Sequence, residues 1–536
     1  MLSPQFTLDL NTEIVVDLFA GGGGASTGIE MALRRHVDVA VNHNPTAISL
    51  HTANHPQTEH YVSDVFEVDP IQASGGRPVS LLWASPDCRH FSKAKGSKPV
   101  SQKVRGLAWI VVRWAKMVRP RCIVTENVEE FQTWGPLTEG GYPCPERKGT
   151  TFKRWVAQLK NLGYQVEWRE LRACDFGAPT IRKRLFVIAR CDGEPIVWPQ
   201  PTHGEGLRPY RTAAECIDWS LSCSSIFERP KSLAAATLRR VAHGFKRYTL
   251  ESSKPYIVRI GQTGHGDGGK VMNIQRPLTT VTTKAEHLVL VPTLIQTGYG
   301  EREGQQPRVP GLDKPLGTAV AGGVKHAITA AVLIKNFGGE PAPGKTAQDL
   351  ASPAPTILAT GGPQSLLTAS LVHLGHGEQS STGAKRWSHG IRDIRVPLNT
   401  ITASGCPAGV VTTHLLKEGA EEGQGLGLEN DHSEDVRNLL VSFYPELAEQ
   451  FPEGPITVDI EGISYKVIDL RMRMLQPHEL FKAQGFPEHY QIDKGALGEK
   501  LTKEAQVRLC GNSVSPAVAE AIVRANLGAQ SLRKAA

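Results

Sequence analysis

The sequence predicts an α/β fold: a doubly wound, mostly parallel sheet that is interrupted by a smaller, inserted β-rich domain. Two observations lead to this prediction. Between residue 13 and about residue 190, short apolar runs alternate with stretches of helical periodicity, which is typical of parallel strands joined by helices. From about residue 195 to about residue 430, Pro, Gly, Thr and Ser are dense and long helical patterns are scarce, which favours short strands and turns.

The first region contains apolar runs of strand length with helix candidates between them. The predicted strands lie at 14–19, 37–41, 79–83, 122–125, 164–167 and 185–189. The predicted helices lie at 25–35, 45–54, 101–118 and 150–162. Because parallel strands need a crossover between them, this alternation is what a doubly wound sheet requires.

The second region carries an internal repeat within 256–417. Pro-x-x-Thr, followed by an aliphatic residue or Ala, begins at Pro277, Pro315, Pro353 and Pro397. An apolar run follows later in each copy, so we expect repeated β structure. The basic segment 230–243 is an exception, because its pattern is helical.

Residues 465–530 return to the α/β pattern, with YKVIDLRMRML, PHELFKAQGF and GNSVSPAVAEAIVRANL. We therefore expect three parts: the first part of the α/β domain at 1–195, the β-rich insert at 196–464, and a C-terminal segment at 465–536 that completes the α/β domain. A chain of 536 residues is long enough for two or three cores.

Composition limits the class of protein. The net charge of +7 fits a local nucleic-acid surface better than a wholly basic protein. The nine cysteines form no CxxC pair and no zinc-like Cys/His cluster, so we expect thiols in the reducing cytoplasm and no metal. We expect no membrane span and no secretory signal, because no run of 18 apolar residues occurs and the start is polar.

The first motif is DLFAGGGG at 17–24, between a predicted strand and a predicted helix. Glycines there let the backbone pass close to a ligand at a helix N-terminus. The pattern lacks GxxxxGK[ST], which argues against a phosphate-binding P-loop. By itself the motif fits an unspecified ligand of a nucleotide-binding type of fold as well as it fits any particular cofactor.

Two further motifs follow predicted strands, at the sheet edge where open α/β proteins bind ligands. SPDCRHFS at 85–92 places Cys88 among cations that lower a thiol pKa, namely Arg89, His90, Lys93 and Lys95. The alternative is a buried structural cysteine. ENV at 126–128 places Glu126 where a carboxylate can protonate or hydrogen-bond a ring nitrogen; the alternative is a solvated loop residue.

Taken in order, DLFAGGGG, PDCRHFS, ENV, GAPTIRKRLFVIA, RMLQPHELFKAQGFP and GNSVSPAV resemble the DNA (cytosine-5)-methyltransferases, over about 13–190 and 465–525. The resemblance implies a Rossmann-like methyltransferase fold. It also implies methyl transfer from S-adenosyl-L-methionine to C5 of cytosine, in double-stranded DNA at a specific sequence. The target base would have to be flipped out of the duplex.

The resemblance also assigns catalytic roles. Cys88 matches the nucleophile that adds to C6 of cytosine and makes C5 enamine-like. Glu126 matches the residue that contacts N3 and the exocyclic amine. Arg182 and Arg184 match the stretch that fixes the base and its adduct, and phosphate binding is the alternative for this pair.

For the cofactor, the resemblance implies contacts from Phe19, Ala20, Gly21, Gly23, Asn42, Asp64, Pro86, Asn512 and Ser513. Asp64 matches the acidic residue that faces the adenine amine. Pro86 matches the boundary between cofactor and cytosine. Asn512 and Ser513 match the segment at the methionine end.

Three positions depart from the family pattern. Asn42 stands where an acidic residue usually binds the ribose, and a neutral hydrogen bond would have to replace that contact. Asp87 stands where Pro usually precedes the nucleophile, and an adjacent carboxylate raises a thiol pKa unless Arg89 or His90 offsets it. Thr180 stands where Gln usually opens the arginine motif.

The position of the insert predicts target recognition, because the family places its variable DNA-reading segment there. Candidate contacts to bases and phosphates are Lys325, His326, Lys335, Asn336, His373 and Arg386; the alternative is a β scaffold. We expect a monomer, with a cognate restriction endonuclease as a partner in a restriction-modification system.

Three other functions remain as alternatives. They are an RNA cytosine-5 methyltransferase, a catalytically silent DNA-binding homologue and a nicotinamide-dependent dehydrogenase. Intact Cys88, Glu126, Arg182 and Arg184 argue against the silent homologue, and the missing G-x-G-x-x-G spacing argues against the dehydrogenase.

Overall fold

The computed structural model describes most of the chain outside the β-rich insert. The described residues are 13–88, 91, 105–218, 221, 223–233, 235–250, 431–460 and 463–533, together with eight strand segments between 256 and 417. The chain forms two compact units. The first comprises Met1–Ala178, Lys183–Pro209 and Gln484–Ala536, and the second comprises Pro179–Arg182 and Tyr210–Ala483.

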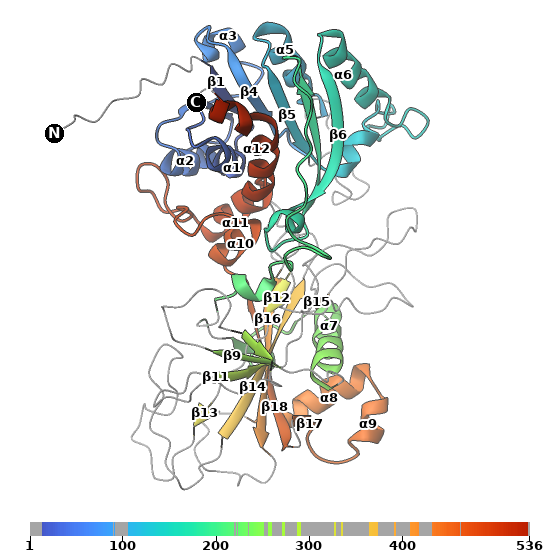
Figure 1. Cartoon of the computed structure of the whole chain (residues 1–536). Coiled ribbons are helices and arrows are strands. Elements are labelled where there is room, and N and C mark those ends of the chain that lie inside the picture. The colour runs from blue at the N-terminus through green and yellow to red at the C-terminus, as the bar shows by residue number, and fades with distance from the viewer. Residues whose placement is uncertain are drawn as a thin grey trace, which may run out of the picture. The chain divides into compact units, whose positions relative to one another are not determined.

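The first unit is built on a seven-stranded sheet with the order β3-β2-β1-β4-β5-β7-β6 (Figure 1). Its strands are β1 (Ile14–Leu18), β2 (Val39–Asn42), β3 (Glu59–Val62), β4 (Val79–Ala84), β5 (Cys122–Asn127), β6 (Gln165–Arg172) and β7 (Lys183–Arg190). Strands β1 to β5 pair in parallel, and β7 pairs antiparallel with β5 and β6. The predicted fold class, a doubly wound and mostly parallel sheet, is confirmed.

Helices cover both faces of this sheet. The described helices of this unit are α1 (Gly24–Leu33), α2 (Pro45–Asn54), α3 (Pro70–Ser74), α5 (Trp109–Met117), α6 (Thr150–Asn161), α11 (Lys503–Asn512) and α12 (Pro516–Arg533), with the 3-10 turns η2 (Glu129–Thr133) and η3 (Ala173–Phe176). Within the helix predicted at 101–118, Arg105 is helical and α5 spans Trp109–Met117 after a short turn, while 101–104 lie outside the described residues. Strand β3 was not among the predicted runs.

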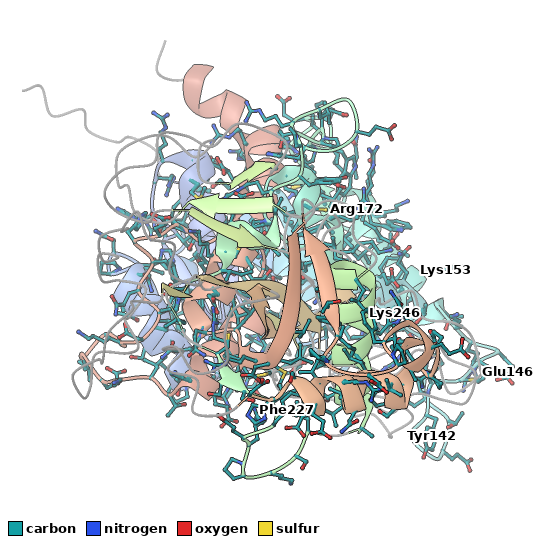
Figure 2. All side chains as sticks on the ribbon, turned by 90° about the horizontal axis from the view of Figure 1, so that it is seen from below. Tyr142, Glu146, Lys153, Arg172, Phe227 and Lys246 are labelled. Atoms are coloured by element: carbon teal, nitrogen blue, oxygen red, sulfur yellow. The ribbon has the colours of Figure 1, made fainter. Side chains whose placement is uncertain are left out.

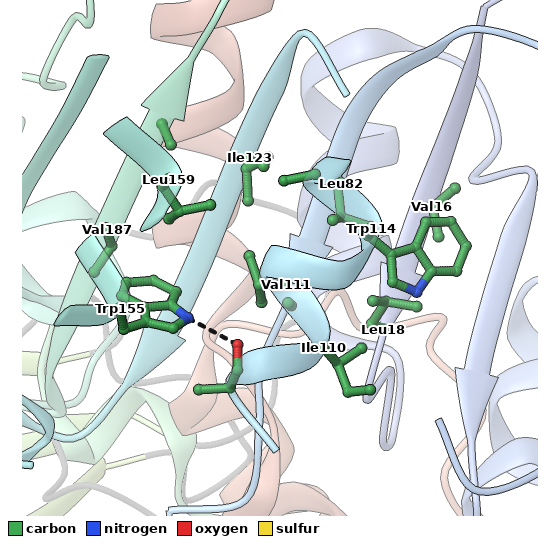
Figure 3. Close-up of a cluster of buried hydrophobic side chains, with 14 of the residues drawn as sticks. Val16, Leu18, Leu82, Ile110, Val111, Trp114, Ile123, Trp155, Leu159 and Val187 are labelled. Carbon is green, nitrogen blue, oxygen red and sulfur yellow. Dashed lines mark hydrogen bonds between the residues drawn. The ribbon is translucent and has the colours of Figure 1, made fainter. Parts of the chain in front are cut away.

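Successive side chains of the strands point to opposite faces of the sheet and form two separate hydrophobic cores, one on each face. On one face, Val16 and Leu82 pack with Trp114 of α5 and Trp155 of α6, all buried (Figure 3). The indole Nε1 of Trp155 donates to the carbonyl of Ala108 at 2.8 Å. The other face packs against α1 and α12. Burial on both faces explains why these strands are continuous apolar runs.

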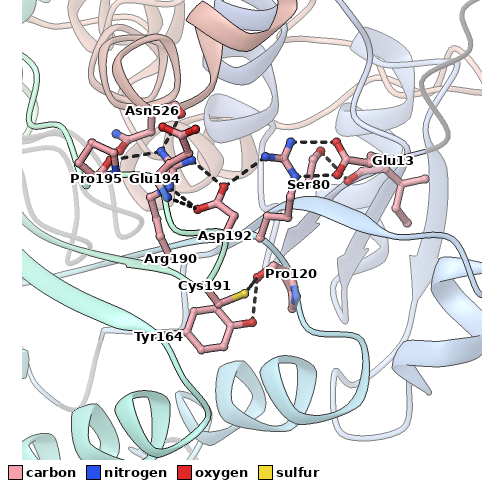
Figure 4. Close-up of polar contacts among 12 residues, drawn as sticks. Glu13, Ser80, Pro120, Tyr164, Arg190, Cys191, Asp192, Glu194, Pro195 and Asn526 are labelled. Carbon is pink, nitrogen blue, oxygen red and sulfur yellow. Dashed lines mark hydrogen bonds and ion pairs between the residues drawn. The ribbon is translucent and has the colours of Figure 1, made fainter.

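A network of hydrogen bonds and ion pairs connects the C-terminal helix α12 to the sheet. Arg190 donates to the carbonyl of Asn526 at 2.8 Å and to the Asp192 carboxylate at 2.7 Å. Arg121 joins the same Asp192 to the Glu13 carboxylate, with an Nε–Oε1 distance of 2.6 Å (Figure 4). This network connects residues next to β1, β5 and β7 with the last helix.

The second unit contains a three-stranded and an eight-stranded sheet, which confirms the predicted β-rich insert. The first has β9 (Tyr256–Arg259), β10 (Val271–Asn273) and β11 (His287–Leu290). The second has β8 (Ser224–Ser225), β12 (His326–Ile328), β13 (Ile334–Lys335), β14 (Gln364–His373), β15 (Ile391–Arg392), β16 (Ala408–Lys417), β17 (Thr457–Ile460) and β18 (Ile463–Met474). Helices α7 (Ala235–Phe245), α8 (Ser433–Phe443) and α9 (Glu446–Gln450) belong to it, as does most of α10 (Pro477–Gln484).

The chain passes from the first unit to the second between Pro209 and Tyr210 and returns between Ala483 and Gln484. The sequence analysis placed these boundaries at 195 and 464. The difference at the second boundary comes from YKVIDLRMRML. This segment lies in β18, which pairs with β16 and β17 rather than with the seven-stranded sheet. The repeat positions Pro277, Pro315, Pro353 and Pro397 lie outside the described residues.

Candidate active site

Of the two motifs predicted to carry the chemistry, the Cys88 motif follows β4 and the Glu126 motif begins within the end of the neighbouring parallel strand β5. Strand β4 ends at Ala84, which is paired with Thr125 of β5, so Cys88 and Glu126 lie at the same edge of the sheet. A direct bond joins the two segments: the Asn127 side chain donates to the carbonyl of Pro86 at 3.0 Å, and both residues are buried. This bond fixes the start of the Cys88 segment to the end of β5.

Arg184 reaches Glu126 because β7 runs antiparallel to β5. Glu126 is paired with Phe186, and Arg184 lies two residues earlier on the same face of the strand. The Arg184 Nε atom is 3.3 Å from Glu126 Oε1, and the side chains are only 10% and 9% exposed. A carboxylate this deeply buried needs a cation beside it, and Arg184 supplies one.

The other arginine of the motif lies in the segment Pro179–Arg182, which belongs to the second unit. Arg182 is buried, and its backbone N–H donates to the Thr180 hydroxyl at 3.3 Å. The Thr180 side chain therefore binds the backbone immediately before the Arg182 side chain.

Cys88 is a partly exposed thiol four residues beyond β4. Its carbonyl accepts a hydrogen bond from the N–H of Phe91 at 2.9 Å, which closes a turn. Asp87 is also partly exposed. The neighbouring cations Arg89, His90, Lys93 and Lys95 lie outside the described residues.

The glycine motif forms a tight turn between β1 and α1. Phe19, Gly21 and Gly23 have positive φ angles of 63°, 56° and 82°. The turn is held against the next strand, since the Ala20 N–H donates to the carbonyl of Val41 at 3.1 Å. No side chain caps α1, which begins directly after Gly23, so its first amides are suited to an electron-rich ligand group.

The C-terminal segment packs directly on this turn. A Cβ atom on Gly24 would collide with the Ser513 hydroxyl and the Val514 carbonyl, and one on Gly23 would collide with the Tyr490 hydroxyl. Tyr490 also donates to the carbonyl of Gly22 at 2.6 Å. Ser513 is therefore buried beside the turn, whereas Asn512 is exposed at the end of α11.

The remaining predicted cofactor residues follow the next two strands. Asn42 ends β2, and its Oδ1 accepts the N–H of Asn44 at 2.9 Å. Asp64 comes two residues after β3, and its Oδ1 accepts the N–H of Phe66 at 3.2 Å. Because β1, β2 and β3 are adjacent and parallel, Phe19, Asn42 and Asp64 lie along one edge of the sheet.

Asp17 is a buried acid beneath the turn that the sequence analysis did not single out. Its Oδ2 accepts a hydrogen bond from the Ser26 hydroxyl at 2.8 Å. Among the described residues no group donates to its Oδ1. Burial raises the pKa of Asp17 to about 7, although the bonds from Ser26 partly oppose this. The signal in the sequence was an acid near the end of an apolar strand, four residues before the first glycine.

Of the residues that the structure describes, no group of three or more His, Cys, Asp or Glu side chains is arranged to hold a metal ion. None of the described helices is both long enough and apolar enough to cross a membrane.

A glycine turn follows β1, Cys88 follows β4, Glu126 lies near the end of β5 and Arg184 near the start of β7, and this is the edge of a doubly wound sheet at which such folds bind ligands. The family model "C-5 cytosine-specific DNA methylase" matches residues 14–205 and 411–527, which is more than half of the chain. The chain therefore belongs to the C-5 cytosine-specific DNA methylase family.

Curated relatives share part of the chain. Type II methyltransferase M1.HphI of Haemophilus parahaemolyticus is 30% identical over 38% of this chain and 51% of its own length. Type II methyltransferase M.AquIA of Picosynechococcus is 27% identical over 38% of this chain and 87% of its own length. Type II methyltransferase M.SacI of Streptomyces achromogenes is 28% identical over 37% and 54%. For M1.HphI and M.SacI the match spans about half of the relative's length.

Solved structures align over nearly the whole chain but only loosely. The S. pombe Dnmt2 methyltransferase is 13% identical, covers 97% of this chain and 99% of its own, and has a TM-score of 0.42. A Spodoptera frugiperda DNMT2 variant is 12% identical, covers 95% and 97%, and has a TM-score of 0.43.

Proposed function

We propose that this chain transfers a methyl group from S-adenosyl-L-methionine to C5 of cytosine, at a specific sequence in double-stranded DNA. The observation that supports this most is the joined edge of β4, β5 and β7. There the Cys88 segment is bonded to Asn127, and Glu126 is paired with Arg184 at 3.3 Å.

The turn after β1 suits S-adenosyl-L-methionine. Phe19, Ala20, Gly21 and Gly23 would hold it at the α1 N-terminus, with Ser513 and Asn512 at the methionine end. Asn42 and Asp64 would bind the ribose and adenine, and Pro86 would line the boundary with the cytosine. The unsatisfied Oδ1 of buried Asp17, below this turn, suits a ligand that brings positive charge. When bound, the cofactor supplies an electrophilic methyl group on a sulfonium.

In the proposed reaction, the Cys88 thiolate adds to C6 of a cytosine that has been flipped out of the duplex. The C5–C6 π electrons become an enamine, and Glu126 stabilises this state at N3 and the exocyclic amine. The enamine carbon C5 takes the methyl group from bound S-adenosyl-L-methionine, whose S–CH3 bond would break so that the sulfonium leaves as a neutral thioether. A base then removes the C5 proton, and the electrons released expel Cys88 as the thiolate and restore the ring.

Arg184 orients Glu126 in this scheme. The pair is nearly excluded from solvent, and the interaction with a nearby cation is stronger where water is absent. The carboxylate is therefore held in one position at the end of β5. Arg182 is proposed to contact the base or its adduct.

The partners are proposals as well. The relatives named above are called Type II methyltransferases, which supports a cognate restriction endonuclease as a partner. We also propose that the enzyme is a cytoplasmic monomer. The insert at 196–464, between the parts at 1–195 and 465–536, is proposed to read the target sequence.

The test uses the full-length chain expressed in a host without cytosine methylation. Sequencing of the methylated DNA should reveal one short recognition site. Purified enzyme should then transfer labelled methyl groups to a duplex with that site and not to a scrambled duplex or to tRNA. Preferred transfer to tRNA would contradict the proposal of a DNA substrate.

Cys88→Ser tests the covalent step, because a hydroxyl is a much weaker nucleophile than a thiolate at neutral pH. The variant should lose turnover while keeping its affinity for S-adenosyl-L-methionine. A duplex with 5-fluorocytosine at the target should trap the wild type and not this variant, since fluorine cannot leave as a proton does. Substantial turnover by the variant would remove Cys88 from the mechanism.

A further inference from the structure

We propose that Phe91 and Arg105 are positioning residues for the nucleophile. They would fix the turn that begins at Cys88 to a buried aromatic cluster that follows Glu126 in the chain. This inference rests on the proposed function. It adds an explanation of how Cys88 and Glu126 are held in fixed positions relative to each other.

The first step concerns the turn itself. The Phe91 N–H donates to the Cys88 carbonyl at 2.9 Å, so a displacement of Phe91 is transmitted to the backbone of the nucleophile. The Phe91 ring packs edge-on against Phe131 and Trp134, with ring centroids 5.1 and 5.8 Å away. These distances are typical of favourable aromatic pairs.

The second step concerns what this ring packs on. Phe131 lies in η2, which begins two residues after Asn127, and it is fully buried. It stacks with Trp134 at 5.4 Å and meets the edges of Phe152 and Trp155 of α6 at 5.5 and 5.7 Å. The cluster is thus part of the main core, and close-packed cores move little.

The third step concerns Arg105, which lies over the Phe91 ring. Its guanidinium is 4.9 Å from the centre of the Phe91 ring, and its Nη2 donates to the Gly135 carbonyl at 2.8 Å. The side chain is only 5% exposed. A cation over an aromatic face is attracted to it, more strongly when water is excluded.

Gly135, whose carbonyl accepts the hydrogen bond from Arg105, lies in a closely packed part of the backbone. A Cβ atom there would collide with the Arg147 carbonyl, so the two ends of the loop between η2 and α6 are in close contact. The middle of that loop extends outward, and the side chains of Tyr142 and Glu146 lie at the periphery (Figure 2). Arg105 therefore holds the inner end of the loop, where it meets the aromatic cluster.

Together these contacts give the Cys88 segment two attachments to the Glu126 segment. One is the Asn127–Pro86 hydrogen bond before the nucleophile, and the other is Phe91 with Arg105 after it. A nucleophile placed within reach of its target contributes strongly to rate, and a displacement of about 1 Å costs on the order of 100-fold. Phe91 and Arg105 need not touch the substrate to have this effect.

The test compares Phe91→Ala, Phe91→Tyr, Arg105→Met and Arg105→Lys in the full-length enzyme. The readouts are single-turnover methyl transfer, the rate of trapping by 5-fluorocytosine DNA, and the dissociation constants of cofactor and duplex. Trp168→Ala is the matched control, because Trp168 packs on Phe152 of the same cluster from the exposed strand β6. Melting temperatures check that each variant is folded.

Phe91→Ala and Arg105→Met should slow single-turnover transfer and trapping by roughly 10- to 100-fold, with both dissociation constants within about 2-fold of the wild type. Phe91→Tyr should restore most of the rate, Arg105→Lys part of it, and Trp168→Ala should react normally. The double variant should lose much less than the product of the two single losses, because both act on one contact. If Phe91→Ala unfolds, Phe91→Leu replaces it with the same expectation.

Normal trapping by Phe91→Ala, or equal losses in Phe91→Ala and Trp168→Ala, would overturn the positioning role while leaving the proposed function standing. A loss confined to DNA affinity would likewise overturn it, since it would make these residues DNA contacts. A wild type that neither methylates nor is trapped by any duplex would overturn the proposed function, and the positioning role with it.

Discussion

At the scale of single residues, Asp17 belongs to a chain of polar groups that runs from the buried Ser26 and His51 to the partly buried His60. Its partner Ser26 lies 3.0 Å from His51 Nε2, and His51 Nδ1 lies 2.8 Å from His60 Nε2. Burial, with added repulsion from His55 and His60, lowers the pKa of His51 well below its ordinary value. His51 is therefore neutral near pH 7 and leaves the charge on Asp17 uncompensated.

Asp17→Asn should consequently change how stability depends on pH. The pKa of Asp17 is about 7 in the folded protein, above its ordinary value of 3.8. At a pH between these two values, the Asp17 carboxyl is therefore ionised in the unfolded chain and protonated in the folded protein. Wild-type stability contributed by this group falls as pH rises through that window, and the loss is complete above about pH 7. Asn cannot titrate and avoids the loss.

Denaturant unfolding of the cofactor-free protein at pH 5, 6, 7 and 8 measures the effect. The free energy of unfolding of the variant, minus that of the wild type, should increase up to about pH 7 and then level off. A difference that stays constant across these pH values would show that Asp17 titrates normally.

Glu126→Gln should lower the methyl-transfer rate by roughly 100-fold or more, the scale expected when an acid–base partner is lost. Its cofactor affinity should stay near that of the wild type, because Glu126 lies near the end of β5 and the glycine turn follows β1. Single-turnover assays and cofactor titrations check both statements. Glu130→Gln, three residues after Asn127 in η2, is the control; a normal rate for Glu126→Gln would exclude a role in catalysis.

At the scale of secondary-structure elements, the close crossing of α1 and α12 joins the two ends of the first unit. A Cβ atom on Gly28 would come 2.6 Å from the Ala519 Cβ and would collide with the Pro516 carbonyl. The backbone carbonyl cannot move as a flexible side chain can. Gly28 is therefore required by the close approach of the two helices.

Gly28→Ala should destabilise the protein by about 1–3 kcal/mol, the usual cost of overpacking, although Ala is the better helix former. Met31→Ala on the same helix is the control, because Met31 is 41% exposed. Chemical denaturation measures both. Equal stability of Gly28→Ala and the wild type would show that α12 shifts to make room.

Sequence patterns predicted the parallel strands and the edge at which the motifs meet. Buried strands appear as continuous apolar runs, and chemistry at parallel sheets gathers at the strand ends; both rules need only local sequence. This is why Cys88, Glu126 and Phe19 could be placed at one edge beforehand. The short strand β3, in which Glu59 and Val62 are exposed, carries no such apolar signal.

Other features depend on pairings between distant segments. The antiparallel direction of β7 decides that Arg184 meets Glu126, and no local pattern reports strand direction. The pairing of β18 with β16 likewise places an apparently α/β segment in the second unit. The Phe91–Arg105 contact was missed because an Arg fourteen residues from a Phe has no distinctive spacing in the sequence.

At the scale of the whole molecule, the insert should determine which sequence is methylated. A chimera that carries 196–464 from a relative with a different site should methylate the relative's site, with Cys88 chemistry intact. His326, Lys335 and His373 fall in described strands, while Lys325, Asn336 and Arg386 lie outside the described residues. Methylome sequencing of cells that express the chimera shows which sequence it methylates. A folded, active chimera that still methylates the original site would place recognition outside the insert.

The packing of α12 on α1 also has a consequence for biosynthesis. Translation produces β1 and α1 early, but Tyr490 and Ser513, which close on the glycine turn, emerge only after the insert has been made. Until then the face of α1 that bears Ile29 has no α12 to cover it, and such exposed surface is prone to aggregation. A nascent chain stalled within the insert therefore lacks the residues that pack on the glycine turn, and this turn is complete only in chains whose synthesis has reached the last helix.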